Sequence, residues 1–312
     1  MIARAVELLR AGRLVAFPTE TVYGLGADAT NAQAILRIFS AKGRPSTNPL
    51  ICHVADEAMA REYALHWPAA ATEITKKFWP GPITIVVPKV TSIPPQATAG
   101  RETVGLRAPN HPLTLELLRA FGKPIAGPSA NKSNHVSPTT AQHVRDELGD
   151  AVDLILDGGP CTIGIESTVL DLSGNHPTIL RPGGVTREQI ESSIGPVDVI
   201  TATVAPDSAA LSPGQHARHY APRTPAVRVE RGELNSVAIP GRGFLLINAP
   251  PAAVNMHSII AMPGDPSAYA RQFYAVLRRL DGLALRQIVI EMPPDEPAWA
   301  AVRDRIIRAT TA

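Results

Sequence analysis

The sequence is poor in cysteine and in charged residues. Two cysteines, Cys52 and Cys161, occur among 312 residues, too few for a disulfide scaffold or a four-thiolate zinc site. Charged residues make up 19%, against roughly 25% in an average soluble domain. Lys and Arg number 30 and Asp and Glu 28, so the net charge is +2. Because neutralising nucleic-acid phosphates requires a basic excess, we expect no strong direct binding to nucleic acid.

Long apolar runs and two common catalytic motifs are also missing. No apolar run reaches the roughly 18–20 residues of a membrane-spanning helix, and Glu7, Arg10 and Arg13 interrupt the N-terminal stretch, so it does not resemble a signal peptide. The chain has no P-loop and no G-x-S-x-G elbow, which argues against Ser167 as a hydrolase nucleophile. We therefore expect a cytoplasmic protein with no membrane segment.

Strand and helix patterns alternate along most of the chain. The apolar run 83–88 is typical of a buried strand, and 112–121 has the spacing of an amphipathic helix. Residues 201–226 contain four prolines and no periodic apolar face, which predicts a linker or a long loop. The pattern thus predicts an α/β domain over 1–200 and a smaller α/β domain over 227–312.

The segment 18–26 follows a predicted strand and carries two threonines and a glutamate. Loops at strand ends are where α/β folds bind ligands. Residues 24–29 also match the dinucleotide fingerprint GxGxxA, but in that motif the glycines leave the strand directly and open a helix. We therefore interpret Gly24 and Gly26 as residues of a tight turn in a loop.

Several cations and one histidine lie next to predicted elements. Lys42 and Arg44 follow a helix, where they bracket a polyphosphate or carboxylate or form a solvated charge pair. Arg107 and Arg181 each end an apolar strand, and a buried cation requires an anion. The partner of Arg107 is then a structural carboxylate or a ligand carboxylate. His53 follows a strand and is either a site residue or a core histidine.

Polar side chains also gather in two later segments. Ser129 and Asn131 suit hydrogen bonds to phosphate or ribose oxygens, or else an N-cap and a turn. The segment 212–222 is rich in functional side chains for a linker. His216 and His219 within it lack nearby Asp or Cys co-ligands for a metal, which favours a clamp over an anionic ligand.

Taken in order, these segments resemble one family, the YrdC-domain threonylcarbamoyl-AMP synthases in their long form with an extra C-terminal domain. The motifs that carry the resemblance are PTETVYGLGA at 18–27, K-x-R-P at 42–45, NPL at 48–50, PGPIT at 80–84, TVGLRAP at 103–109, GPSAN at 127–131, ESTVLD at 166–171, LRPG at 180–183 and SPGQHARHYAP at 212–222. The resemblance implies an α/β fold with a twisted mixed sheet flanked by helices. It also implies a smaller, Rossmann-like α/β domain at the C-terminus.

The resemblance further implies a nucleotidyltransferase. It would make L-threonylcarbamoyladenylate and pyrophosphate from L-threonine, bicarbonate or CO2 and ATP, with Mg²⁺ bound to the ATP and no metal held by the protein alone. Partner proteins would accept the intermediate to modify tRNA. The implied catalytic residues are Lys42, Arg44 and Arg181. The implied threonine site consists of Thr19, His53, Arg107, Gly127 and Ser167. The implied ATP site consists of Lys42, Arg44, Ser46, Thr103, Ser129, Asn131, Ser137, Arg181, Arg218, His219 and Tyr220.

The linker is implied to fold back as a lid over the site. Arg218, His219 and Tyr220 would then help to exclude water from a labile intermediate. The family commonly reads SPGMKYRHYAP here, whereas residues 215–217 of this chain are Gln, His and Ala. A lysine and an aromatic ring are thus missing, so phosphate contacts from 215–217 do not carry over from the family.

Two alternatives are left open. A carbamoyl-transfer enzyme of the hydrogenase-maturation type shares the YrdC-like domain but needs zinc-finger and acylphosphatase-like regions, for which this chain lacks the cysteines. A non-catalytic module for double-stranded RNA or tRNA would need a basic face, but residues 1–205 carry 18 basic and 19 acidic residues.

Overall fold

A large mixed sheet forms the first part of the molecule. The computed structural model of the chain describes residues 1–200, 211–214, 217–248 and 258–311. Within them, ten strands are ordered β10-β9-β8-β4-β5-β3-β6-β2-β1-β7, with both parallel and antiparallel pairs. These strands are β1 (Val15–Phe17), β2 (Gly24–Asp28), β3 (Ile51–His53), β4 (Ile83–Pro88), β5 (Thr103–Arg107), β6 (Ile125–Ala126), β7 (Leu154–Ile155), β8 (Thr168–Asp171), β9 (Thr178–Arg181) and β10 (Asp198–Val199). The expected twisted α/β fold is confirmed.

Helices surround this sheet. They are α1 (Ile2–Arg10), α2 (Ala32–Lys42), α3 (Glu57–Tyr63), α4 (Ala69–Phe78), α5 (Pro95–Thr98), α6 (Pro112–Phe121), α7 (Ala141–Leu148), the 3-10 turn η1 (Gly149–Ala151) and α8 (Arg187–Ile194). The side chain of Asn31 caps the first turn of α2, and Gly43 ends that helix at a φ of 60°. Apolar side chains of α1 and α6, such as Leu9 and Leu118, pack in one cluster with Phe17. The amphipathic spacing thus predicts α6 at the residues where the structure has it.

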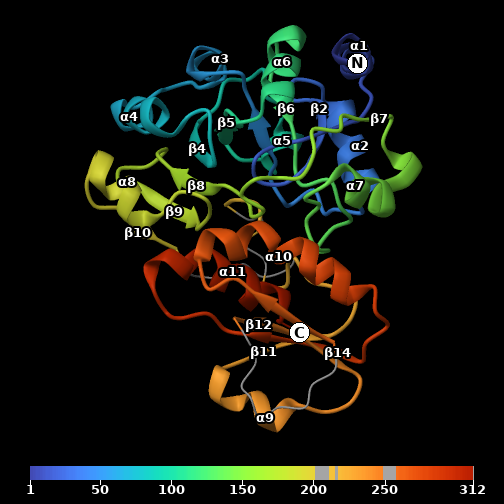
Figure 1. Cartoon of the computed structure of the whole chain (residues 1–312). Coiled ribbons are helices and arrows are strands. Elements are labelled where there is room, and N and C mark those ends of the chain that lie inside the picture. Colours follow the sequence, from blue (N-terminus) through green and yellow to red (C-terminus); the bar gives the residue numbers. More distant parts are fainter. Residues whose placement is uncertain (201–210, 215–216, 249–257, 312) are drawn as a thin grey trace.

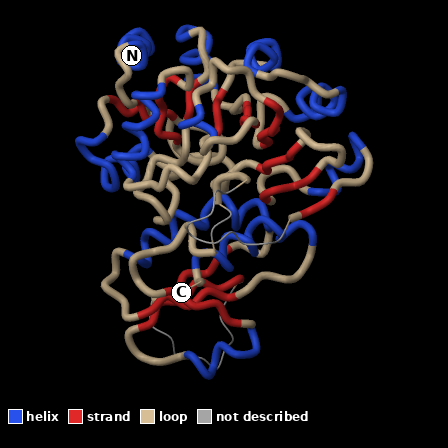
Figure 2. The backbone as a smooth tube through the Cα atoms, turned by 180° about the vertical axis from the view of Figure 1, so that it is seen from behind, coloured by secondary structure: helices blue, strands red, loops and turns tan. Residues whose placement is uncertain are grey.

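A parallel four-stranded sheet forms the second part. Its order is β11-β14-β12-β13. The elements are β11 (Ala226–Val229), η2 (Arg231–Glu233), α9 (Leu234–Val237), β12 (Arg242–Ile247), β13 (Ile259–Met262), α10 (Pro266–Asp281), β14 (Gln287–Glu291), η3 (Pro297–Trp299) and α11 (Ala300–Ala309). Helices α10 and α11 lie between this sheet and the large one (Figure 1). Loops of the upper part face these helices when the molecule is seen from behind (Figure 2).

The segment between the two sheets contains part of the predicted linker. Its described residues, 211–214 and 217–225, form no helix or strand, while the first strand of the second sheet begins at Ala226. A backbone bridge joins Ala221 to His135 of the large part. The boundaries that the sequence predicts at residues 200 and 226 stay a prediction.

The expected turn at Gly24 and Gly26 is wrong. Both glycines lie in β2, which pairs antiparallel with β1, so the GxGxxA match is no phosphate-binding loop. The ring of Phe17 occupies the space beside them: a Cβ on Gly24 would lie 2.5 Å from its Cζ, and one on Gly26 2.9 Å from its Cε1. Glycine is therefore required here for close packing within a strand.

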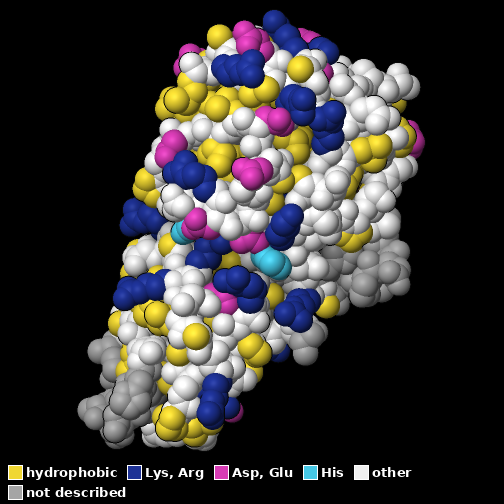
Figure 3. Space-filling view, turned by 90° about the vertical axis from the view of Figure 1, so that its right-hand side faces the viewer, with side chains coloured by type: hydrophobic (Ala, Val, Ile, Leu, Met, Phe, Trp, Pro, Cys, Tyr) yellow, Lys and Arg dark blue, Asp and Glu magenta, His cyan; other side chains and the backbone are white. Residues whose placement is uncertain are grey.

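The surface carries charges of both signs. On the face in Figure 3, Lys and Arg side chains are interspersed with Asp and Glu. Among the described residues, no helix combines the length and the apolar character needed to cross a membrane.

Candidate functional site

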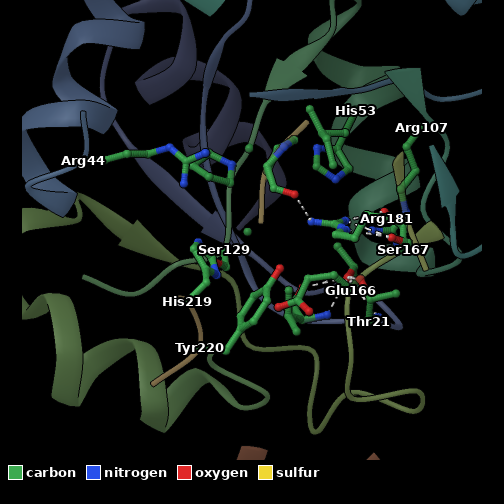
Figure 4. A pocket seen from close by; sticks show the side chains of 17 residues that line it. Thr21, Arg44, His53, Arg107, Ser129, Glu166, Ser167, Arg181, His219 and Tyr220 are labelled. Atoms are coloured by element: carbon green, nitrogen blue, oxygen red, sulfur yellow. Dashed lines mark hydrogen bonds between the residues drawn. The ribbon is translucent and has the colours of Figure 1, made fainter. Parts of the chain in front are cut away.

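A pocket opens where loops of the large sheet meet the segment that joins the two parts. It is lined by Thr19, Thr21, Val22, Gly24, Arg44, Ile51, His53, Arg107, Gly127, Pro128, Ser129, Glu166, Ser167, Arg181, Pro213, His219 and Tyr220, around about 520 Å³ of empty space. In Figure 4, the side chains of Arg44, Ser129 and His219 lie to one side, and those of Arg107 and Ser167 to the other. Ten of the predicted site residues thus share one pocket.

His53, at the end of β3, forms part of the wall. Its ring meets Phe17 edge-on, with centroids 5.1 Å apart. A Cβ on Gly127 would lie 2.7 Å from Phe17 Cζ and 3.1 Å from His53 Nδ1, so glycine keeps this wall open. Burial, and then the charge of Arg107, lower the pKa of His53 to about 3, which makes the imidazole neutral at pH 7. Its Nδ1 has no hydrogen-bond partner among the described residues.

Arg107, at the end of β5, has a carboxylate partner within the chain. Its Nη2 lies 2.8 Å from Glu20 Oε2, and the two side chains are 5% and 4% exposed. Its Nε donates to the carbonyl of Gly81 at 3.2 Å. Arg107 thus has a structural carboxylate as a partner, and Glu20 is a residue that the sequence prediction missed. A ligand carboxylate beside Glu20 stays a prediction. Neither Glu20 oxygen accepts an aligned hydrogen bond among the described residues, so the pair is held by charge.

Arg181, at the end of β9, joins two other segments. Its Nη2 donates to the carbonyl of Ser167 at 2.9 Å and to Ser167 Oγ at 3.2 Å, while its Nη1 donates to the carbonyl of Pro213 at 3.0 Å. The Ser167 hydroxyl also lies 2.8 Å from Thr84 Oγ1. The side-chain partners of Ser167 are a hydroxyl and a guanidinium. Ser167 is therefore equipped to bind a ligand, and among the described residues it lacks the attached base of a hydrolase nucleophile.

Lys42 and Arg44 are both buried, so the interpretation as a solvated charge pair is wrong. Lys42 is the last residue of α2, and its Nζ donates to the carbonyl of Ser129 at 2.6 Å and to Asn131 Oδ1 at 3.3 Å. It lies behind the pocket, where burial and the nearby Arg44 hold its pKa well below the ordinary value. Arg44 lines the pocket and leaves its Nε without a partner among the described residues.

Two residues of the predicted lid, His219 and Tyr220, line the pocket. Tyr220 adopts a φ of 58°, a conformation that costs about 1–3 kcal/mol and clusters at functional sites. Gly214, at a φ of 86°, makes room for it, since a Cβ there would lie 2.3 Å from the tyrosine oxygen. His219 Nδ1 and Tyr220 Oη have no hydrogen-bond partner among the described residues. Burial, and then nearby cations, hold the pKa of His219 well below its ordinary value.

Other predicted site residues lie outside the pocket lining. Ser46 and Arg218 are exposed, and Thr103 lines a neighbouring hollow. Asn131 and Ser137 are buried behind the pocket. The lid departure includes Gln215 and His216, which lie outside the described residues, as does any metal site involving His216.

Glu166 and Thr21 are pocket residues that the sequence prediction missed. Glu166 Oε1 accepts a hydrogen bond from Ser137 Oγ at 2.6 Å. The available signal was its place in the ESTVLD motif, directly before Ser167. A carboxylate directly before Ser167 in the motif suggests a group that supports the serine. The motif could not show which residues Glu166 itself contacts.

No cluster of three or more His, Cys, Asp or Glu side chains that could hold a metal occurs in the part of the chain that the structure describes. The pocket instead offers cations and unpartnered polar atoms. Arg44 Nε, His53 Nδ1, His219 Nδ1 and Tyr220 Oη are all buried and without a partner among the described residues. Because buried polar atoms in proteins are nearly always hydrogen-bonded, these atoms indicate a polar ligand, and the arginines favour an anionic one.

Family models match both the N-terminal and the C-terminal part of the chain, and full-length relatives match nearly all of it. Residues 7–183 match the family model described as telomere recombination, and residues 185–311 match the model of the threonylcarbamoyl-AMP synthase C-terminal domain. The threonylcarbamoyl-AMP synthase of Bacillus subtilis is 41% identical over 319 residues, covering 99% of this chain and 92% of the relative. That of Pyrococcus abyssi is 37% identical over 324 residues, covering 98% and 93%.

A solved structure shares the fold of the whole chain. The crystal structure of P. abyssi Sua5 complexed with L-threonine aligns with a TM-score of 0.92 at 37% identity, covering 99% of this chain and 94% of that one. The family models and the relatives span both sheets and the segment between them. The chain therefore belongs to the threonylcarbamoyl-AMP synthase family, a family of enzymes with nucleotidyltransferase-type activity.

Proposed function

We propose that this enzyme makes L-threonylcarbamoyladenylate and pyrophosphate from L-threonine, CO2 or bicarbonate, and ATP. The observation that carries the proposal is a single pocket in which Arg44, Arg107 and Arg181 surround buried, unpartnered polar atoms. The reaction brings together an amino-acid carboxylate and a triphosphate. Both ligands are anionic, and both suit the planar fork of arginine.

The threonine end of the pocket is assigned to Thr19, His53, Arg107, Gly127 and Ser167. Arg107 receives the amino-acid carboxylate beside its existing partner Glu20. The neutral His53 offers an unpartnered Nδ1 to a hydroxyl or amine, depending on its tautomer. The close wall formed by Phe17 and Gly127 limits the size of the amino acid at this end.

The ATP end is assigned to Arg44, Ser129, Arg181, His219 and Tyr220. Lys42 acts on this end indirectly, because its ammonium holds the carbonyl of Ser129. Asn131 and Ser137 support the same loops from behind the lining. Ser46, Thr103 and Arg218 stay predictions for the outer part of the nucleotide site. Mg²⁺ arrives with the nucleotide, because it prefers phosphate oxygens and water over a dedicated protein cage.

The chemistry requires positioning more than a side-chain base. The threonine amine adds to CO2, a C–N bond forms, and one proton leaves to water, giving a carbamate. A carbamate oxygen then attacks the α-phosphorus of ATP, the bond to the bridging oxygen of the β-phosphate breaks, and pyrophosphate leaves with that electron pair. Arg44 and Arg181 stabilise the charge that develops on the phosphates. With its pKa lowered to about 3, His53 is a weak base at neutral pH, which fits release of the proton to water.

The product is a labile mixed anhydride, so exclusion of water by His219 and Tyr220 protects it. We propose that partner proteins accept this intermediate and transfer the threonylcarbamoyl group to an adenosine of tRNA beside the anticodon. This enzyme then need not bind RNA strongly itself, in line with the mixed charge of the face in Figure 3.

The test is pyrophosphate release by the purified full chain with ATP, Mg²⁺, bicarbonate and labelled threonine, with each component omitted in turn. We expect release that depends on both threonine and bicarbonate, and its absence would refute the proposal. Arg107→Lys keeps a charge beside Glu20 but loses the planar fork, so it should raise KM for threonine more than KM for ATP. The matched control is Arg187→Lys, whose guanidinium pairs with Glu191 at the surface.

A further inference from the structure

One arginine of the C-terminal part reaches three segments around the pocket. Arg305, on α11, is fully buried. Its Nε lies 2.7 Å from Glu166 Oε2, and its Nη2 donates to the carbonyl of Pro182 at 3.0 Å. Its guanidinium carbon lies 4.9 Å from the ring centroid of Tyr220. Glu166 and Tyr220 line the pocket, and Pro182 directly follows Arg181, so a single side chain contacts the pocket segments from three directions.

The C-terminal part supplies most of the support for Glu166. Tyr274 Oη, from α10, donates to Glu166 Oε2 at 2.8 Å, next to the bond from Arg305. The other oxygen of Glu166 accepts from Ser137 at 2.6 Å. Burial raises the pKa of Glu166, but the charges of Arg305 and Arg181, together with hydrogen bonds from Ser137 and Arg305, bring it below its ordinary value. The carboxylate is therefore charged at neutral pH, and the larger of the two cationic contributions comes from the C-terminal part.

The same side chains hold Tyr220 in its strained backbone conformation. The Tyr220 ring contacts both side chains: the guanidinium of Arg305 lies against it, and the centroid of the Tyr274 ring is 5.9 Å away. The neighbouring amide of His219 donates to the carbonyl of Arg308 on α11 at 3.3 Å. A residue with a φ of 58° persists only where its surroundings determine it from several sides, and here α10 and α11 provide those contacts.

We propose that Arg305 and Tyr274 are positioning residues for the ATP end of the site, so that the C-terminal part completes the pocket although it does not line it. This inference rests on the proposed function. The contacts of Arg305 lead to three residues assigned to ATP: Ser137 through Glu166, Arg181 through Pro182, and Tyr220 directly. Of the threonine end they reach Ser167, which directly follows Glu166, whereas no hydrogen bond of Glu166 or Arg305 among the described residues goes to Thr19, His53 or Arg107. The ATP end therefore depends on Arg305 at more points than the threonine end does.

The test compares Arg305→Met with Arg303→Met in the full chain. Arg303 lies on the same helix, but its partners are Asp295 and the carbonyl of Pro293, within the C-terminal part. We expect Arg305→Met to lower kcat/KM for ATP by about 10²-fold, the loss that follows a misplacement of about 1 Å. The KM for threonine should change far less, and Arg303→Met should resemble the wild type.

Adding Glu166→Gln to Arg305→Met is the decisive second step. The amide removes the buried charge that the first substitution leaves uncompensated, so the double variant should recover about tenfold of the lost kcat/KM. Tyr274→Phe, which removes only one hydroxyl, gives a milder loss in the same direction. Equal losses for ATP and threonine, or a lower melting temperature with unchanged KM values, would reduce Arg305 to a structural role and overturn the inference.

A second readout does not depend on activity. Trypsin cleaves after Arg218, which is exposed and two residues from Tyr220. Arg305→Met should accelerate that cleavage, followed by mass spectrometry, whereas Arg303→Met should not. If the wild type releases no threonine-dependent pyrophosphate, the proposed function fails, and this cleavage rate alone decides whether Arg305 holds the segment. Equal rates in the two variants would overturn the inference.

Discussion

Replacing Glu20 with glutamine tests whether Arg107 depends on its partner within the chain. The two groups lie 2.8 Å apart and are 4% and 5% exposed. Glutamine has nearly the same shape, so the change removes charge and leaves a buried guanidinium alone. Breaking one side of a buried ion pair costs about 3–5 kcal/mol. At about 2–4 °C per kcal/mol for a unit of this size, the melting temperature should fall by about 6–20 °C.

Threonine should restore part of this loss if its carboxylate meets Arg107. A ligand at about 100 times its Kd stabilises the folded state by about 2.7 kcal/mol. The increase in melting temperature on adding threonine should be larger in Glu20→Gln than in the wild type, because the free cation gains more from a carboxylate. Differential scanning calorimetry with and without threonine measures both effects.

Two further variants complete this test. The matched control is Glu7→Gln, which breaks a pair with Arg4 at the surface and should cost about 0–1 kcal/mol. The double variant Glu20→Gln with Arg107→Met removes both charges, so it should melt higher than Glu20→Gln alone. A Glu20→Gln protein that melts like the Glu7→Gln control would refute the reasoning.

Three more predictions follow from single side chains. Because burial and a nearby guanidinium lower the pKa of His53 to about 3 from 6.5, the unfolded chain takes up the proton first on acidification. The contribution of His53 to the free energy of unfolding is then fully present above pH 6.5 and decreases toward pH 3, by up to about 1.4 kcal/mol per pH unit. Urea titrations at several pH values should show that the free energy of unfolding depends less on pH in His53→Asn. Gly24→Ala places a Cβ 2.5 Å from Phe17, so urea unfolding should show a loss of about 1–3 kcal/mol, whereas Gly174→Ala, with open space around it, should show little change. Arg181→Lys loses the fork that joins two pocket segments, so the pyrophosphate assay should show a higher KM for ATP, and urea unfolding should show a loss of about 1–3 kcal/mol from buried carbonyls left without a donor.

Much of the fold could be predicted because its signals are local. Helix α6 combines an amphipathic face with a proline in its first turn and Gly122 at its end, at a φ of 73°. Strand β2 gave no such signal. All five of its residues are buried, so it shows no alternation, and two of them are glycines whose missing side chains are compensated by the ring of Phe17. That compensation comes from a neighbouring strand and is invisible in a local pattern.

The site was predictable where a motif names the residue, and not where the partner is distant. Thr19 and Ser167, which belong to family motifs, line the pocket as the resemblance implies. The motifs did not reveal that Lys42 faces backbone carbonyls or that Arg107 already holds Glu20. The residues next to a buried charge in the sequence do not reveal its partner, because the fold brings that partner from a distant segment. Glu166 shows this most clearly, since its guanidinium partner is 139 residues away along the chain.

That separation gives the molecule an order of assembly during synthesis. A ribosome adds about 5–20 residues per second, so about 7–28 s pass between the emergence of Glu166 and that of Arg305, 139 residues later. The residues of the large sheet are all synthesised before this interval ends, but Glu166 gains its contacts with Arg305 and Tyr274 only when the C-terminal part has emerged. On the role proposed for Arg305, the pocket would then be completed late in translation, because the arginine lies near the end of the sequence.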